Sequence, residues 1–268
     1  KGLTFRSNVG FTITGTRRAV FYDATSLARA NFGTAQAFSS TGFIPNLNWD
    51  NILSYTKDIG DHTITATGVV SYVQSDYDSL YAAGYNQLLS SQLFYNLGAT
   101  DALGRELLTQ FTSWNNLAFA GRLNYSYKGK YLLTLTGRYD GASRLAPGNK
   151  WDFFPSAAVA WNISEENFMR ELSFINNLKL RGSYGVSGKY SIAPYGTQSG
   201  LVYYPMGFGD IPAPSYVIGG TIGNPALGWE KSATTNFGLD VSVLNNRLSL
   251  TLDLYKTVTS DILLRRSL

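Results

Sequence analysis

Apolar and polar side chains alternate with period two along nine stretches of the chain, which is the pattern of β-strands with two unlike faces. The pattern predicts strands over roughly 3–15, 46–58, 62–74, 113–127, 131–141, 152–162, 178–188, 231–243 and 248–258. A typical globular strand has about 5–6 residues, whereas a tilted strand needs about 9–11 to cross a bilayer. Since each of the nine has 11 to 15 residues, their length favours an antiparallel, all-β, membrane-spanning sheet.

The connections between these strands alternate in length. IGD, KGK and LNNR are tight turns, whereas the long or ten-residue connections are 16–45, 75–112, 142–151 and 189–230. In an up-and-down sheet the two kinds fall at opposite ends, as in outer-membrane barrels with short periplasmic turns and long extracellular loops. We therefore expect Ala146, in one of the longer connections, to be accessible from outside the cell.

One connection does not fit the alternation. Residues 163–177 (ISEENFMRELSFINN) fall at the tight-turn end but are long. Ser164, followed by Glu165 to Leu172, predicts a helical turn with Ser164 as its N-cap.

Charged residues keep to one register of the predicted strands. The polar register, which would face the lumen of a barrel, holds Arg122, Arg138, Lys179, Arg181, Asp240 and Asp253. The opposite register, which would face lipid, holds residues such as Leu123, Leu133, Leu135, Val159, Leu180, Phe237, Leu250 and Leu254. A soluble barrel would segregate charges too, and the register weakens at Asn51 and Ile52. The segregation thus supports β structure more strongly than it supports a membrane.

Aromatic residues gather at the tight-turn end of the apolar register. They are Tyr125, Tyr127, Tyr131 and Trp161. Rings with a polar tip suit the headgroup layer, so the cluster is typical of an interfacial girdle. Ordinary cross-strand pairing of aromatic rings explains the same pattern, and the sequence leaves both explanations open.

Composition agrees with a chain partly hidden from water, because charged residues make up 15% and aromatic residues 14%. There is no cysteine for disulfides or thiolate ligands, and no apolar run long enough for a transmembrane helix. The net charge of +4 is not gathered into blocks, which gives nucleic-acid binding little support. The start, KGLTFRSNVG, lacks Met and the apolar core of a signal peptide, so we expect a mature, trimmed or incomplete chain.

The sequence offers little catalytic chemistry, and we expect neither an enzyme nor a metal or cofactor site. The one histidine, His62, is expected to be a solvated turn residue. GSYGVSGKY at 182–190 fails as a phosphate-binding loop, because Ser183 and Tyr190 stand where a Gly and a Ser or Thr are required. Glu165 and Glu166 are expected to be charges in the first turn of the short helix.

Longer strings carry a family resemblance. Residues 123–169 (LNYSYKGKYLLTLTGRYDGASRLAPGNKWDFFPSAAVAWNISEENFM), 178–188 and 223–264 closely resemble the barrel of SusC/RagA-like TonB-dependent transporters of the Bacteroidetes outer membrane, as does KGLTFRSNVGFT near the start. The resemblance implies a multi-pass barrel of about 22 strands with an N-terminal plug, energised by TonB and covered by a SusD-like lipoprotein. It weakens over 16–45, 75–112 and 189–222.

The chain departs from that family pattern in extent. It holds about nine of the strands and neither plug nor TonB box, so residues 1–268 are expected to form a middle portion of the barrel domain. An open sheet would leave two unpaired edges in lipid, so we expect the remaining strands elsewhere.

The leading interpretation is active import of an oligosaccharide or peptide. A passive porin or structural barrel, and a soluble sugar-binding β protein or carbohydrate-active enzyme, are the alternatives. Loop 189–230 carries Tyr195, Tyr203, Tyr204, Tyr216 and Trp229 among Gly and Pro. Tyr203, Tyr204 and Tyr216 are the candidate contacts to the lid or the substrate, unless they only pack the loop against its own rim.

Overall fold

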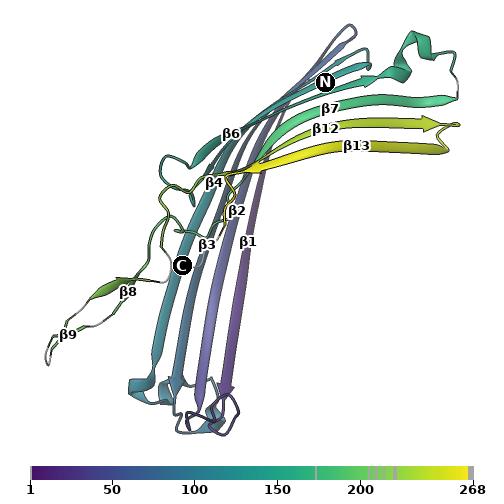
Figure 1. Cartoon of the computed structure of the whole chain (residues 1–268). Helices are drawn as coiled ribbons and strands as arrows, with labels where there is room; N and C mark the ends of the chain where they lie inside the picture. Colours follow the sequence, from purple (N-terminus) through teal and green to yellow (C-terminus); the bar gives the residue numbers. More distant parts are fainter. Residues whose placement is uncertain are drawn as a thin grey trace. The chain divides into compact units, whose positions relative to one another are not determined.

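In the computed structural model, nine long strands pair in chain order into one antiparallel sheet, β1-β2-β3-β4-β5-β6-β7-β12-β13 (Figure 1). The structure describes residues 2–172, 174–204, 206–208, 211–213, 215–219 and 222–264. The long strands are β1 (Gly2–Tyr22), β2 (Gln36–Ile59), β3 (His62–Tyr85), β4 (Glu106–Tyr127), β5 (Tyr131–Ala142), β6 (Trp151–Asn162), β7 (Ile175–Lys189), β12 (Glu230–Val243) and β13 (Leu248–Ser260). All nine predicted strands are therefore confirmed.

Short elements occupy the connections. Two small antiparallel ribbons pair β8 (Leu201–Tyr203) with β11 (Tyr216–Ile218), and β9 (Met206–Phe208) with β10 (Ile211–Ala213). Single 3₁₀ turns are η1 (Ser90–Gln92), η2 (Leu97–Ala99), η3 (Ala102–Gly104), η4 (Ile163–Glu165) and η5 (Asn167–Met169). Within the described ranges no helix has the length and apolar character to span a membrane.

The tight turns have the backbone that their residues suggest. In KGK, Lys128 and Gly129 both have positive φ, at 54° and 69°, and the Lys130 amide donates to the Tyr127 carbonyl at 2.9 Å. This is the type I′ geometry that suits the twist of a two-residue hairpin. A glycine at the second position relieves the strain of the left-handed conformation there.

Two compact units divide the chain. The first comprises Lys1–Asn8, Trp49–Tyr72 and Asn115–Leu268, and the second comprises Val9–Asn48 and Val73–Trp114. Strands β1 to β4 run through both units. These four strands are longer than the sequence predicted, because residues expected in loops 16–45 and 75–112 continue the strands.

Within the second unit, both the extended strands and the turn region between β1 and β2 have their own contacts. Ser113 donates to Asp76 at 2.6 Å, and the ring of Phe38 lies 5.7 Å from that of Tyr81. Arg29 is buried, bonded to the Thr34 carbonyl at 2.9 Å and stacked on Phe32 at 4.4 Å. The local alternation in these segments was too weak to distinguish strand from loop, and cross-strand pairing decided the outcome.

The first unit has a small core near the ends of β5 to β7. Ala142, Leu145, Phe154 and Trp229 are buried together, and Val186, Tyr190 and Ile192 pack against them. The indole of Trp229 meets the rings of Phe154 and Tyr190 edge to face at 5.2 and 5.0 Å, and its Nε1 donates to the Lys150 carbonyl. This core joins connection 142–151 to both ends of loop 189–230.

The expectation that Ala146 is accessible was wrong. It is fully buried, with its amide donating to the Leu227 carbonyl at 3.1 Å. Pro147, its neighbour, is exposed.

Candidate functional site

The strand register of the first unit defines two faces. Directly paired residues of antiparallel strands share a face, and Arg122, Thr136, Ser156, Gly185 and Thr234 form one such row across β4, β5, β6, β7 and β12. Rows on either side place all six candidate charged residues on this same face, which we call the polar face.

The polar face carries a charge network on β7, β12 and β13, the last three strands of the sheet. The guanidinium of Arg181 makes a two-point contact with Asp240, at 2.8 and 3.0 Å, and its Nη2 lies 3.2 Å from a carboxylate oxygen of Asp253. Asn236 donates to the same Asp253 carboxylate at 3.1 Å. Planar two-point pairing fixes the orientation of both partners, so these strands present an ordered polar surface.

The three other candidates lie along the same face. Arg122 Nε donates to Thr136 at 3.3 Å, Arg138 pairs with Asp140 at 2.7 Å, and Lys179 stands directly opposite Asp240. The structure thus brings Lys179, Arg181, Asp240 and Asp253 together, and places Arg122 and Arg138 apart from them on the neighbouring strands. That this face lines a lumen stays a prediction.

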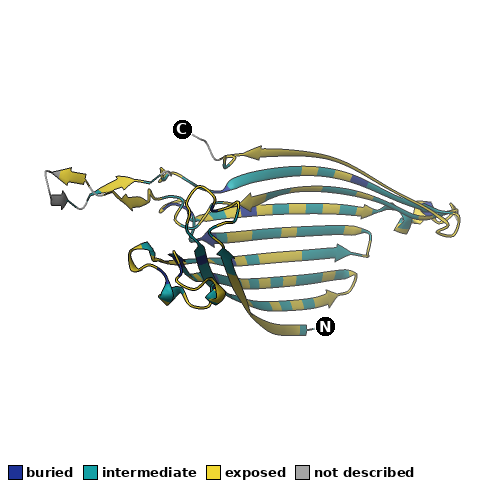
Figure 2. Ribbon diagram, turned by 90° about the horizontal axis from the view of Figure 1, so that it is seen from below, coloured by how far each residue is buried: buried dark blue, intermediate teal, exposed yellow. Residues whose placement is uncertain are grey.

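The opposite face, which we call the apolar face, carries the more exposed side chains. Along β6 the exposed class alternates with less exposed residues, and the exposed ones include Phe153, Val159 and Trp161 (Figure 2). Val159 is 57% and Leu254 65% exposed. A water-soluble sheet buries this face, whereas a membrane wall turns it outward.

Two aromatic belts bound the apolar face. At the tight-turn end the rings of Tyr127, Tyr131 and Trp161 stack in sequence, at 6.3 and 6.4 Å. At the other end Tyr139 stacks on Trp151 at 5.0 Å. On β5 the belts are joined by residues 131–139, and these nine residues match the length that a tilted strand needs to cross a bilayer. The rings pair across neighbouring strands, which is one of the two explanations that the sequence left open. Their position at the ends of the apolar face also agrees with the other explanation, an interfacial girdle.

The apolar band shifts along the strands from β5 to β13. Leu135 stands mid-way between the belts on β5, but the row that contains it continues through Ala157, Tyr184 and Thr235 to Lys256. On β13 the band is instead Leu248 to Leu254. Barrel strands are tilted, so residues in one hydrogen-bonded row lie at different depths.

The connection after β6 is organised by Glu166 and not by Ser164. Ser164 lies inside η4 and caps nothing, so the predicted N-cap was wrong; the connection makes two 3₁₀ turns. Glu166 accepts hydrogen bonds from Tyr131 Oη at 2.7 Å, Lys130 Nζ at 2.9 Å and Trp161 Nε1 at 3.1 Å. These donors, Lys130 first, lower the pKa of Glu166 to about 2.

His62 is likewise not a solvated turn residue. It is the first residue of β3, half-buried, and its Nδ1 lies 2.8 Å from the Tyr125 hydroxyl. Its ring is 4.8 Å from that of Tyr127, which makes it part of the belt at the tight-turn end. Within its own strand His62 shares parity with Ile64 and Ala66, which was the clue that the sequence offered.

Loop 189–230 separates its aromatic residues into two groups. Trp229 belongs to the buried core, whereas Tyr203, Tyr204 and Tyr216 are exposed by 55, 58 and 65%. Tyr203 and Tyr216 face each other across the β8–β11 ribbon with ring centroids 5.7 Å apart, and the Tyr204 amide donates to the Ser215 carbonyl. The three tyrosines therefore lie together on a short two-stranded arm.

The sequence motifs considered for metal and phosphate chemistry take other roles in the described ranges. No set of three His, Cys, Asp or Glu side chains there could hold a metal ion. Glu166 is engaged by its three donors, and GSYGVSGKY lies mostly within β7, as a strand and not a phosphate loop.

Comparison with known proteins decides the family. The sequence profile described as "TonB dependent receptor-like, beta-barrel" matches residues 2–268. The chain belongs to this family. It is 33% identical over 267 residues to TonB-dependent receptor P3 of Formosa agariphila, covering 100% of this chain and 26% of that protein. It is 36% identical over 171 residues to TonB-dependent receptor SusC of Bacteroides thetaiotaomicron, covering 61% of this chain and 17% of SusC.

Among solved structures, a chain of the RagAB peptide transporter superposes with a TM-score of 0.87 and 26% identity, over 98% of this chain and 29% of that one. The SusC/RagA-like family and the transmembrane β-barrel fold expected from the sequence are both confirmed. The chain spans about a quarter of the length of relatives such as P3, so its nine strands are part of a larger barrel. These relatives are named receptors and transporters, which agrees with the expectation of a non-enzyme.

Proposed function

We propose that the complete protein imports a bulky nutrient, an oligosaccharide or a peptide, across the outer membrane with energy supplied through TonB. The observation that supports the proposal is that the sheet has two unlike faces: an exposed apolar face bounded by aromatic belts, and an opposite polar face that carries the Arg181 charge network. The likeness to SusC and to RagAB, described as a peptide transporter, supports the same function.

In this proposal the apolar face contacts lipid and the polar face lines the lumen or meets a plug. Residues 1–268 form one portion of the barrel domain. The tight turns lie in the periplasm, and loop 189–230 lies outside the cell. A SusD-like lipoprotein covers the mouth, and Tyr203, Tyr204 and Tyr216 contact that lid or the substrate.

Gene deletion in the parent bacterium tests import. A strain without the complete receptor should lose growth on one class of substrate, either peptides or oligosaccharides supplied as the sole source, and a strain without TonB should lose growth on the same class. Complementation by the intact gene is the control. Unchanged growth on both classes would refute import, and uptake that persists without TonB would identify a passive pore.

A further inference from the structure

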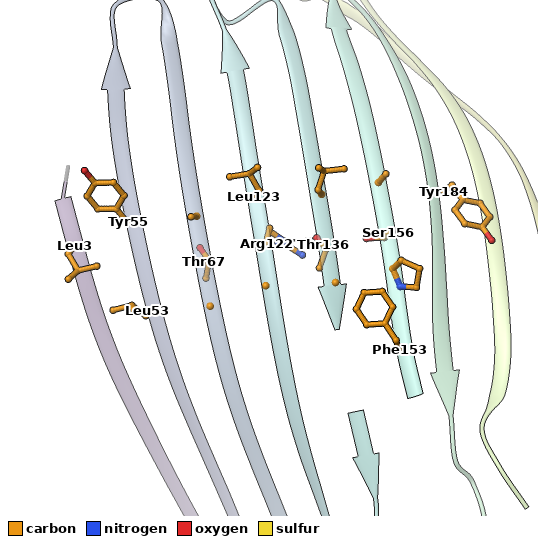
Figure 3. A pocket seen from close by; sticks show the side chains of 17 residues that line it. Leu3, Leu53, Tyr55, Thr67, Arg122, Leu123, Thr136, Phe153, Ser156 and Tyr184 are labelled. Carbon is orange, nitrogen blue, oxygen red and sulfur yellow. Dashed lines mark hydrogen bonds between the residues drawn. The ribbon is translucent and has the colours of Figure 1, made fainter. Parts of the chain in front are cut away.

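The apolar face of the first unit is hollowed over β3 to β6, with residues of β1, β2 and β7 at the sides of the hollow (Figure 3). Arg122, Thr136 and Ser156, which belong to the polar face, are also among the lining residues. The hollow has a volume of about 760 Å³, and leucine and aromatic side chains, among them Leu53, Leu123, Leu135 and Tyr184, surround it. Its floor is made of small residues, among them Gly68, Gly121, Gly137, Pro155 and Ala157.

The floor follows from the register of the strands. Gly121, Gly137 and Pro155 are direct partners on three successive strands, so no long side chain rises from this row. A Cβ added at Gly68 or Gly121 would meet no atom within 4 Å, which means that both positions border open space. At Gly137, by contrast, the Phe153 ring already covers the backbone, because an added Cβ would lie 2.9 Å from its Cζ.

The position of the hollow identifies what surrounds it. Leu135, on its wall, is four residues from each of the belt residues Tyr131 and Tyr139 on β5. The hollow therefore lies in the part of the wall that meets hydrocarbon, which rests on the proposed lipid-facing orientation. At that depth acyl chains are the most abundant apolar groups, and they are flexible enough to follow an uneven surface.

We propose that this hollow binds one acyl chain of a bilayer lipid, seated over Gly68 and Gly121. The hydrophobic effect contributes little to binding inside a bilayer, so the attraction comes from close van der Waals packing. An acyl chain in the hollow contacts protein at the floor and the walls, whereas a chain on a flat part of the face contacts protein on one side only. The bound lipid completes the outer surface of the wall where the side chains are missing.

Photo-crosslinking tests the site. The complete receptor is placed in vesicles that contain phosphatidylethanolamine with a diazirine in the middle of one acyl chain, irradiated, and mapped by mass spectrometry. Adducts on Leu123 and Leu135 should exceed those on Leu250, which shares the apolar face outside the hollow, by severalfold.

Glycine substitutions make the comparison specific. The double variant Gly68→Leu, Gly121→Leu fills the hollow and should lower adducts at Leu135 to the level of Leu250. The matched control is Gly182→Leu, on the same face but outside this hollow, where the new Cβ makes only ordinary contacts with Val159 and Phe237; it should leave the adducts at Leu135 unchanged.

The possible results separate the two proposals. Equal labelling of Leu135 and Leu250 in the unaltered receptor overturns the acyl-chain site but keeps the lipid-facing wall, and this comparison needs no variant to fold. Labelling of neither residue overturns the lipid-facing orientation itself. Crosslinks from Leu135 to another protein chain in place of lipid also overturn the acyl-chain site.

Discussion

At the scale of single residues, Glu166 connects the hairpin turn after β4 to the connection after β6. Its three donors come from β5, β6 and the KGK turn, and Asn162 adds a hydrogen bond from its amide to the Lys130 carbonyl at 2.7 Å. The polar tips of two belt aromatics, Tyr131 and Trp161, are thereby bound by a carboxylate in the connection after β6. A carboxylate that accepts three hydrogen bonds strongly prefers its ionised form.

The stability that Glu166 contributes should depend on pH. Its pKa is about 2 in the folded protein, below its ordinary value of 4.5, so the contribution is fully present above that ordinary value and is lost as pH falls toward 2. Pepsin cleavage of the 163–172 connection, normalised to cleavage in another loop, should rise across this pH range. Glu166→Gln should cleave readily at every pH and lose the dependence, whereas Glu165→Gln, an exposed neighbour, should behave as the parent. A parent profile without pH dependence would contradict this role.

At the scale of elements, each central strand has one apolar face and one polar face, which the proposed function turns toward lipid and toward the lumen. On β5, Leu135 is 43% exposed on the apolar face, and the adjacent Thr134 points to the polar face, where its hydroxyl donates to Asn124 at 3.0 Å. Neighbours in the sequence thus lie on two different faces, because successive side chains of a strand point to opposite sides of the sheet.

Arginine substitutions should reveal this difference. Leu135→Arg should lower the free energy of unfolding by about 2–4 kcal/mol, since it places a cation near the middle of the bilayer, and Leu250→Arg should have a similar cost. Thr134→Arg should cost clearly less, because the lumen is polar. Folding titrations of the complete receptor into lipid vesicles measure all three, and equal costs at Leu135 and Thr134 would sink the assignment of the faces.

At the scale of the whole molecule, loop 189–230 combines a fixed base with an exposed arm. The base is the core around Trp229 and Leu145, and the arm is the β8–β11 ribbon with its three tyrosines. Exposed rings on a short ribbon offer large, rigid contact surfaces, which are typical of residues that contribute strongly to protein interfaces.

Replacing Tyr203, Tyr204 and Tyr216 together with Ala should weaken binding of the lid lipoprotein by about tenfold or more. Co-purification from cells and titration with the isolated lid measure the effect, after equal surface abundance has been confirmed. The triple Phe variant keeps the rings and should bind nearly as the parent does. If the Ala variant retains lid binding, substrate affinity and growth, the tyrosines only shape the loop.

The sequence by itself determined the strands of the membrane-spanning part, their faces, the tight turns and the family. These features are local. The face on which a strand residue lies follows from the period-two alternation of its own strand and does not depend on which strand pairs with it. The pattern thus predicts one face for Arg181, Asp240 and Asp253, and it places Tyr131 and Trp161 in the apolar register at the tight-turn end, where an interfacial girdle and ordinary cross-strand pairing both explain them.

Only the tertiary structure decided which residues act together across the strands. Four features depend on partners that are brought together by strand pairing and loop folding. They are the three donors to Glu166, the contact of the His62 ring with that of Tyr127, the burial of Ala146 and the core position of Trp229. The extension of β1 to β4 into the second unit has the same origin. A weakly alternating segment becomes a strand when a neighbouring strand satisfies its backbone hydrogen bonds. The local sequence pattern does not show which strand that neighbour is.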